Sequence, residues 1–141
     1  MISKIKSLMT SFNILQPQSG QKIGFCQLMR DLTENRKLVY FAEIHSQPAI
    51  INLQLAVLQS LADHVHGRQS KVHVFLEHFS FKDQSLIDEY INNPAISEED
   101  FEKKYHEFSE EGHDISQYFP IFQFAKENIN TITLNGSFIP R

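Results

Sequence analysis

The sequence predicts an α/β protein with a mainly parallel β-sheet flanked by helices. Two apolar runs, 38–44 and 72–76, are typical of strands that are buried in a parallel sheet. An amphipathic helix lies between these runs, and further helices separate the second run from a third at 131–134. The resulting order of strand, helix, strand, helices and strand is typical of folds with right-handed crossover connections.

The N-terminal part is expected to contain little regular structure before its first helix. Residues 12–15 are expected to form a short strand, and 16–24 carry the Pro, Ser and Gly residues that are typical of a loop. A short helix is predicted over 25–34, because apolar side chains recur there at helical spacing: Phe25, Leu28, Met29 and Leu32.

The strongest helical pattern follows the first apolar run. Pro48 suits the first turn of a helix, and apolar residues repeat at helical spacing from there to about His64. Gly67 is suited to end this helix. The run at 72–76 then follows as the second strand.

Three helices are predicted between the second and third strands, over 83–91, 98–108 and 115–128. Ser97 can cap the second of them, and the acidic residues of its first turn suit the positive end of the helix dipole. The third strand, 131–134, is expected to end in Asn135-Gly136.

Length and composition predict a soluble chain of one domain at most. The chain has 141 residues, a net charge of −4 and one cysteine, so a nucleic-acid footprint and a disulfide framework are not expected. No apolar stretch approaches the ~18 to 20 residues of a membrane helix. The N-terminal residues lack the continuous apolar core of a signal peptide, and the compartment is left open.

The predicted sheet is incomplete. Only residues 137–141 follow the third strand, and a three-stranded parallel sheet would leave its hydrophobic edges exposed. We therefore expect the chain to be the N-terminal part of a larger protein or half of an obligate assembly such as a homodimer.

The first candidate site residues are Glu43 and His45, at the end of the first apolar run. In extended chain they project to the same side, and ligands of open parallel sheets lie beyond the carboxyl ends of the strands. This pair can hold a metal, orient the imidazole or act as an acid and base. The alternative is a helix N-cap arrangement with Ser46.

The second apolar run ends in Glu77 and His78. Glu77 occupies the position that matches Glu43, whereas His78 is expected to point to the opposite face, so Glu77 is favoured as a site residue. The alternative for Glu77 is a structural salt bridge. His106 and His113 flank an acidic stretch, for which a solvated loop is favoured over a metal site.

The order of these motifs resembles the ChaN-like haem-binding uptake proteins of the Tiki/TraB/erythromycin-esterase superfamily. The resemblance spans about residues 20–141, which leaves 1–19 as an N-terminal extension. It rests on short motifs in family order: Phe41-Ala42-Glu43-Ile44-His45, Asn52-Leu53-Gln54-Leu55, Leu76-Glu77-His78-Phe79, Asp83-Gln84, Ser97-Glu98-Glu99-Asp100-Phe101, Tyr118-Phe119-Pro120 and Leu134-Asn135.

The resemblance implies a haem-binding domain linked to haem or iron uptake, with the ligand at the carboxyl ends of parallel strands. It implies ligand-binding roles for Glu43, His45, Glu77, His78 and Asn135, and makes His45 and Glu43 the candidate metal ligands. It also implies further sheet and a small helical domain beyond the third strand.

Two other functions stay open, although binding is favoured over catalysis. One is a hydrolase, either metal-dependent with a divalent ion or using acid/base chemistry, in which Glu43 would be the base and His45 a ligand or proton shuttle. The other is a degenerate, non-catalytic domain. It is favoured by Ala42 in place of the family's glycine and by Ile50 and Ile51 where a further histidine is usual.

Overall fold

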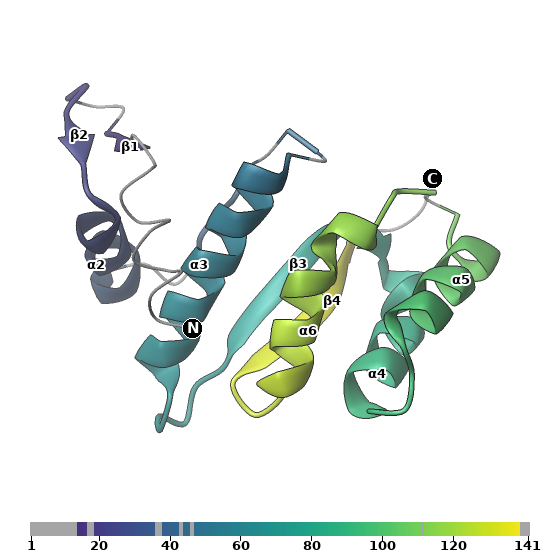
Figure 1. The fold of residues 1–141 in the computed structure, drawn as a ribbon. Coiled ribbons are helices and arrows are strands. Elements are labelled where there is room, and N and C mark those ends of the chain that lie inside the picture. The colour runs from purple at the N-terminus through teal and green to yellow at the C-terminus, as the bar shows by residue number, and fades with distance from the viewer. Residues whose placement is uncertain are drawn as a thin grey trace. The chain divides into compact units, whose positions relative to one another are not determined.

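The chain forms two compact units, residues 1–64 and residues 65–141, each of which is described here by itself. A computed structural model describes residues 14–16, 19–35, 38–42, 44–45, 47–110 and 112–138, drawn as coloured ribbon in Figure 1. The α/β class predicted from the sequence is confirmed, because helices accompany a parallel pair of strands.

The first unit begins with a two-stranded antiparallel hairpin. β1 (Ile14–Leu15) pairs with β2 (Lys22–Ile23), and the turn between them contains Gly20 in the left-handed region at φ 65°. The prediction of a short strand before residue 16 is confirmed for the described residues. The prediction of a loop throughout 16–24 is wrong at β2, because two residues are too short for a recognisable strand pattern.

Two helices provide the core of the first unit. The helices predicted after the loop and after Pro48 are confirmed as α2 (Phe25–Asn35) and α3 (Pro48–Val65). The helices pack through a small apolar cluster of α2 and α3 residues, because their apolar side chains recur on one face. Its buried members are Phe25, Met29, Ala56 and Val57.

The segment between these helices does not form the predicted strand. Of residues 38–44, the structure describes 38–42 and 44, and none of these belongs to a strand or a helix. Four of their apolar side chains are exposed, namely Leu38, Tyr40, Phe41 and Ile44. The prediction of a buried strand is therefore wrong for the described residues, because none of them pairs in a strand and most of them are exposed.

The second unit contains the parallel pair, β3 (Val72–Ser80) and β4 (Ile132–Phe138). Their register runs from Val72 opposite Ile132 to Leu76 opposite Gly136. The three helices predicted between the strands are confirmed as α4 (Gln84–Asn92), α5 (Glu98–Phe108) and α6 (Phe119–Glu127), drawn from green to yellow-green in Figure 1. Two short 3-10 helices, η1 (Phe81–Asp83) and η2 (Ser116–Tyr118), precede α4 and α6.

Both strands are longer than predicted, and β3 contains an irregularity. The register shifts between Leu76 and Ser80, so β3 uses more residues than β4 over the same stretch. Regular alternation places Glu77 outside, but the three residues after it are all buried. This bulge-like bend turns the end of β3 into the core.

Aromatic side chains fill the core of the second unit. Phe79, from the bend in β3, is fully buried and contacts the rings of Phe101, Tyr105 and Phe122 at centroid separations of 5.1 to 6.1 Å. Edge-to-face and offset packing at these separations is favourable beyond the area it buries. The bend in β3 therefore supplies the aromatic residue around which α5 and α6 pack.

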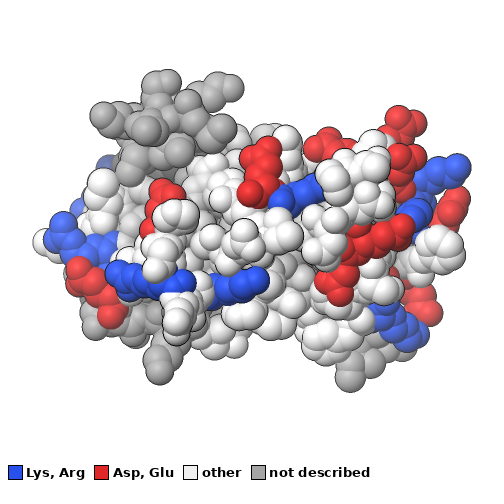
Figure 2. All heavy atoms as spheres, turned by 90° about the horizontal axis from the view of Figure 1, so that it is seen from below, with Lys and Arg blue, Asp and Glu red and all other residues white. Residues whose placement is uncertain are grey.

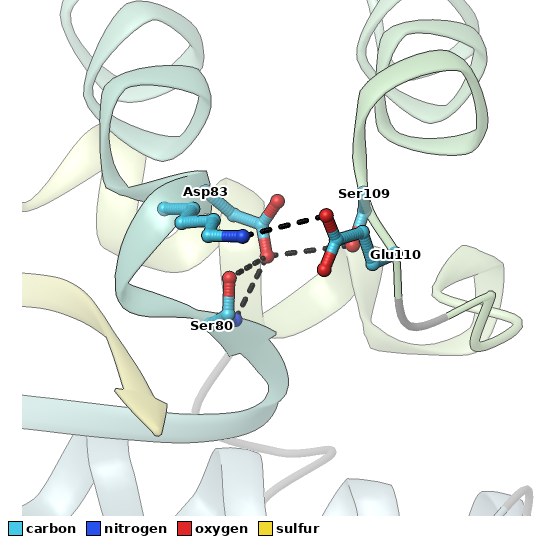
Figure 3. A network of polar contacts seen from close by, with 5 residues as sticks. Ser80, Asp83, Ser109 and Glu110 are labelled. Carbon is cyan, nitrogen blue, oxygen red and sulfur yellow. Dashed lines mark hydrogen bonds and ion pairs between the residues drawn. The ribbon is translucent and has the colours of Figure 1, made fainter. Parts of the chain in front are cut away.

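The buried carboxylate of Asp83 fixes the turn that follows β3 (Figure 3). Its Oδ2 atom accepts hydrogen bonds from the backbone N–H and the hydroxyl of Ser80, both at 2.8 Å, and from the hydroxyl of Ser109 at 3.3 Å. These bonds join η1 to the C-terminal end of α5. A surface ion pair between Lys82 and Glu110, 3.4 Å long, lies beside them.

The described surface carries mixed charge. On the face drawn in Figure 2, Lys and Arg side chains are scattered among Asp and Glu rather than gathered in one stripe. Lys104 and Glu89 form one such exposed pair at 2.6 Å. None of the helices in the described part of the chain is long and apolar enough to cross a membrane.

Candidate functional site

His45 lies in an exposed turn that directly follows the apolar segment 38–44. The turn precedes α3, which begins at Pro48. Glu43 and Ser46 lie outside the described residues, so the predicted pairing of Glu43 with His45 and the alternative N-cap arrangement both stay predictions. What the structure adds is that the imidazole is accessible and that exposed apolar side chains precede it in the chain.

Glu77 and Asn135 belong to one face of the β3–β4 pair. Glu77 is exposed, as are the alternate residues His73 and Phe75, and Asn135 is paired with Phe75 across the ladder. The Nδ2 atom of Asn135 donates to the backbone carbonyl of Val74 at 3.1 Å. Neither Glu77 nor Asn135 ends its strand as predicted, because β3 continues to Ser80 and β4 to Phe138.

His78 lies on the opposite side of β3 from Glu77, as the sequence predicts. Its side chain is buried, with 5% of its surface exposed. The imidazole ring lies 4.0 Å from the ring of Tyr118 and 5.3 Å from the ring of His113, measured between centroids. His78 therefore belongs to the packed interior of the second unit rather than to an accessible face.

His113 is not part of a fully solvated loop, which corrects the sequence-based expectation. Its side chain is half-buried against His78, and its backbone N–H donates to the hydroxyl of Tyr105 at 3.3 Å. That hydroxyl in turn donates to the backbone carbonyl of His78 at 2.8 Å. The Tyr105 hydroxyl thus connects the loop before η2 to the end of β3 through two hydrogen bonds. The spacing of the histidines in the sequence does not predict this contact.

The clearest pKa shifts of carboxylates occur near the starts of η2 and α5. The hydroxyl and backbone N–H of Ser116 donate to Asp114 at 2.6 and 3.0 Å, which lowers the pKa of Asp114. The bonds from Ser97 likewise lower the pKa of Asp100 at the start of α5. Both carboxylates therefore favour their charged form through local hydrogen bonds, which is a structural role.

A groove of about 490 Å³ lies along β4 and was not predicted from the sequence. Its walls come from α4, from the strands and from the turn at Phe81, and it includes both polar and apolar side chains. The volume is within the range of small-molecule pockets. The residues that line it are Lys71, Phe75, Phe81, Gln84, Asp88, Ile91, Asn92, Ile129 and residues 132–136, a set without His, Cys, Met or Tyr.

No group of three or more His, Cys, Asp or Glu side chains that could hold a metal ion occurs among the residues that the structure describes. Glu43, one of the two predicted metal ligands, is outside that set. The metal-binding prediction for Glu43 and His45 therefore stays a prediction.

The chain was compared with models of known protein families. A family model described as "Haem-binding uptake, Tiki superfamily, ChaN" matches residues 28–141. No curated protein and no solved structure matches the chain at a significant level.

Proposed function

Because the chain belongs to the ChaN family of haem-binding uptake proteins in the Tiki superfamily, we propose that it binds haem and that His45 ligates the iron. The family match covers the segment with His45 as well as the whole second unit. The family resemblance seen in the sequence is thereby confirmed. A role in haem or iron uptake is part of the same proposal.

A haem site needs an axial ligand for the iron and apolar surface for the macrocycle, and the segment that ends at His45 offers both. Histidine is a common axial ligand of haem iron. The exposed side chains of Tyr40, Phe41 and Ile44 precede His45 directly in the chain. Exposed apolar residues gathered in one short segment favour a binding role over a merely structural one.

The other candidate places fit an iron ligand less well. His78 is buried against Tyr118, so an iron atom could reach its imidazole only if the packing of the second unit opened. The groove along β4 is lined by none of the residue types that most often ligate haem iron. The accessible imidazole of His45 is therefore the observation that carries the proposal.

Haem titration of the purified protein tests the proposal. We expect a shifted Soret band that saturates at a defined stoichiometry, and His45→Ala should weaken binding by about tenfold or more, because it removes the axial ligand of the iron. A tenfold change corresponds to ~1.4 kcal/mol. His66→Ala is the matched control, since His66 is also exposed and lies in a turn. Its spectrum should remain that of the unaltered protein.

Two results would count against this assignment. A spectrum of free haem at stoichiometric haem would rule out binding by this chain. A Soret shift that is unchanged in His45→Ala would leave haem binding intact but would rule out His45 as the ligand.

A further inference from the structure

Asn135 and Gly136 form a dipeptide that can react with itself. Asn135 is the only asparagine of the sequence that directly precedes a glycine. The backbone nitrogen that follows an asparagine can attack the carbon of its side-chain amide. Glycine favours this attack because it has no Cβ atom and allows the backbone a wide range of conformations. Whether the reaction occurs here therefore depends on how the fold holds the two reacting groups.

The fold holds the two reacting groups by separate hydrogen bonds. The backbone N–H of Gly136, which would attack, donates to the Oε1 atom of Gln84 at 3.0 Å. The Nδ2 atom of Asn135, which would leave, donates to the backbone carbonyl of Val74 at 3.1 Å. One group is thus bonded to α4 and the other to β3, so both bonds must break before the nitrogen can reach the amide carbon.

Gln84 fixes the backbone on both sides of Asn135. Its Nε2 atom donates to the carbonyl of Leu134 at 3.1 Å, while its Oε1 atom accepts from Gly136. The peptide groups before and after Asn135 are therefore held by one side chain. Gln84 is the first residue of α4 and directly follows the buried Asp83, so the start of this helix brings the amide to β4.

The site is within reach of water and close to the end of its strand. The groove along β4 is lined by Gln84, Leu134, Asn135 and Gly136, so solvent adjoins both the restraint and the reacting residues. β4 ends at Phe138, shortly after Gly136. The ends of elements open locally at a lower free energy than global unfolding requires. Local opening at this end would release both reacting groups.

We propose that Asn135 is a site of spontaneous deamidation and that the Gln84 amide restrains the reaction. When the end of β4 opens, the Gly136 nitrogen loses its proton to hydroxide and forms a bond to the Cγ atom of Asn135. The Cγ–Nδ2 bond breaks, Nδ2 takes up a proton and leaves as ammonia, and a five-membered succinimide remains. Water then opens the ring at either carbonyl to give aspartate or isoaspartate. The sum is one water consumed and one ammonia released, without any change of oxidation state.

The product would fit β4 less well than Asn135 does. A carboxylate can only accept hydrogen bonds, so it would lose the bond to the Val74 carbonyl and place a charge beside it. Isoaspartate would also add a carbon atom to the backbone directly before Gly136. An added Cβ atom at Gly136 would already overlap the carbonyl oxygen of Ser80, so the segment has no room for a longer backbone. Deamidation should therefore loosen the β3–β4 pair irreversibly.

Incubation of the folded protein at mildly alkaline pH, followed by peptide mapping with mass spectrometry, tests the proposal. In urea, conversion should be faster at Asn135 than at Asn128, which precedes the β-branched Ile129. In the folded protein, Gln84→Met should accelerate conversion at Asn135 about tenfold, because two hydrogen bonds that oppose opening are lost. Methionine keeps a long side chain that suits a helix but lacks the amide.

Gln123→Met is the matched control. Gln123 is exposed on α6, and its amide donates to Glu127 of the same helix at 3.2 Å. This substitution should leave the rate at Asn135 unchanged. In urea the unaltered protein and Gln84→Met should convert at equal rates, because the restraint exists only in the folded state.

Hydrogen exchange of the unaltered protein provides a second measurement that does not depend on the folding of a variant. If local opening precedes the attack, folding should slow deamidation at Asn135 by the same factor as it slows exchange of the Gly136 amide. Protection of the Phe122 amide, in the buried part of α6, shows in addition that Gln84→Met has folded.

Three results would overturn the proposal. In urea, a rate at Asn135 no higher than that at Asn128 would remove the site. A folded Gln84→Met protein that converts at the rate of the unaltered protein, or no faster than Gln123→Met, would remove the restraint. Deamidation that folding slows far less than it slows exchange at Gly136 would mean that the attack does not require the opening of β4.

Discussion

Two segments of this chain have nearly the same sequence character but different structures. Residues 38–44 and the start of β3 are both apolar runs with a glutamate and a histidine at or just after their ends. The pair is Glu43 and His45 at the first run, and Glu77 and His78 at the second. The second run forms a nine-residue strand, and its end is buried. The described residues of the first form no strand and are largely exposed.

The difference lies in what each segment packs against. β3 pairs with β4 over most of its length, and its final residues are covered by aromatic side chains of α5 and α6. Apolar composition thus indicates that a segment can be a strand, whereas pairing and burial decide whether it becomes one. The first segment consequently exposes apolar side chains beside His45, which is the basis of the haem-binding proposal above.

The largest expected effect tests the tight contact at the end of β3. A Cβ atom on Gly136 would overlap the carbonyl oxygen of Ser80 and lie 2.6 Å from its carbonyl carbon. Neither backbone can move away easily, because the bonds to Asp83 and Gln84 hold both. Gly136→Ala should therefore lower the free energy of unfolding by about 3 kcal/mol, measured by urea denaturation.

Gly24→Ala provides the control in the first unit. A Cβ atom on Gly24 would meet nothing within 4 Å, so its effect should stay near 0.5 kcal/mol, the cost of a poorer position before α2. If Gly136→Ala were as mild as this control, the close approach of β4 to the end of β3 would be wrong.

A smaller effect is expected at a tyrosine that contacts β3, and it is compared with a tyrosine in residues 38–44. The hydroxyl of Tyr105 is buried and bonds both to the carbonyl of His78 and to the N–H of His113. Tyr105→Phe leaves both backbone groups without this partner, so it should cost about 2 kcal/mol in thermal or urea unfolding. Tyr40→Phe alters an exposed ring and should change stability by less than about 0.5 kcal/mol; equal effects would contradict the contrast between the segments.

Within the part of the chain that the structure describes, the sequence was sufficient to predict every helix of eight or more residues, because helical periodicity and caps such as Ser97 are local signals. It was not sufficient to predict the length of β3 or the exposure of residues 38–44. Those depend on the bend before Ser80 and on contacts between residues distant in sequence.

The candidate site could be predicted from the sequence only in part. The opposite faces of Glu77 and His78 follow from alternation along the chain. The exposed turn that holds His45 does not, because the strand predicted before it is absent among the described residues. The groove along β4 could not be predicted, since it depends on a Gln84 side chain that reaches a strand about 50 residues away. The ligand-binding roles of Glu43, Glu77, His78 and Asn135 stay predictions.

The smallest expected effect concerns a local signal that sequence and structure share. The hydroxyl of Ser97 accepts from the backbone N–H of Asp100 at 3.1 Å, as the predicted cap of α5 requires. Ser97→Ala should therefore cost about 1 kcal/mol in urea unfolding at neutral pH. Capping is local, so the effect should not depend on the conformation of residues 38–44.

The same substitution should change a titration, with a sign that follows from the hydrogen bonds. The bonds from Ser97 hold the pKa of Asp100 below its ordinary value of 3.8, so they stabilise the fold above that pH and are lost as the pH falls through the lowered pKa. In Ser97→Ala the pKa of Asp100 should rise toward 3.8, as followed by the carboxyl chemical shift in an NMR titration. An unchanged titration would mean that the lower pKa comes instead from the backbone N–H of residue 97, which alanine retains, and from the charges of Lys103 and Lys104.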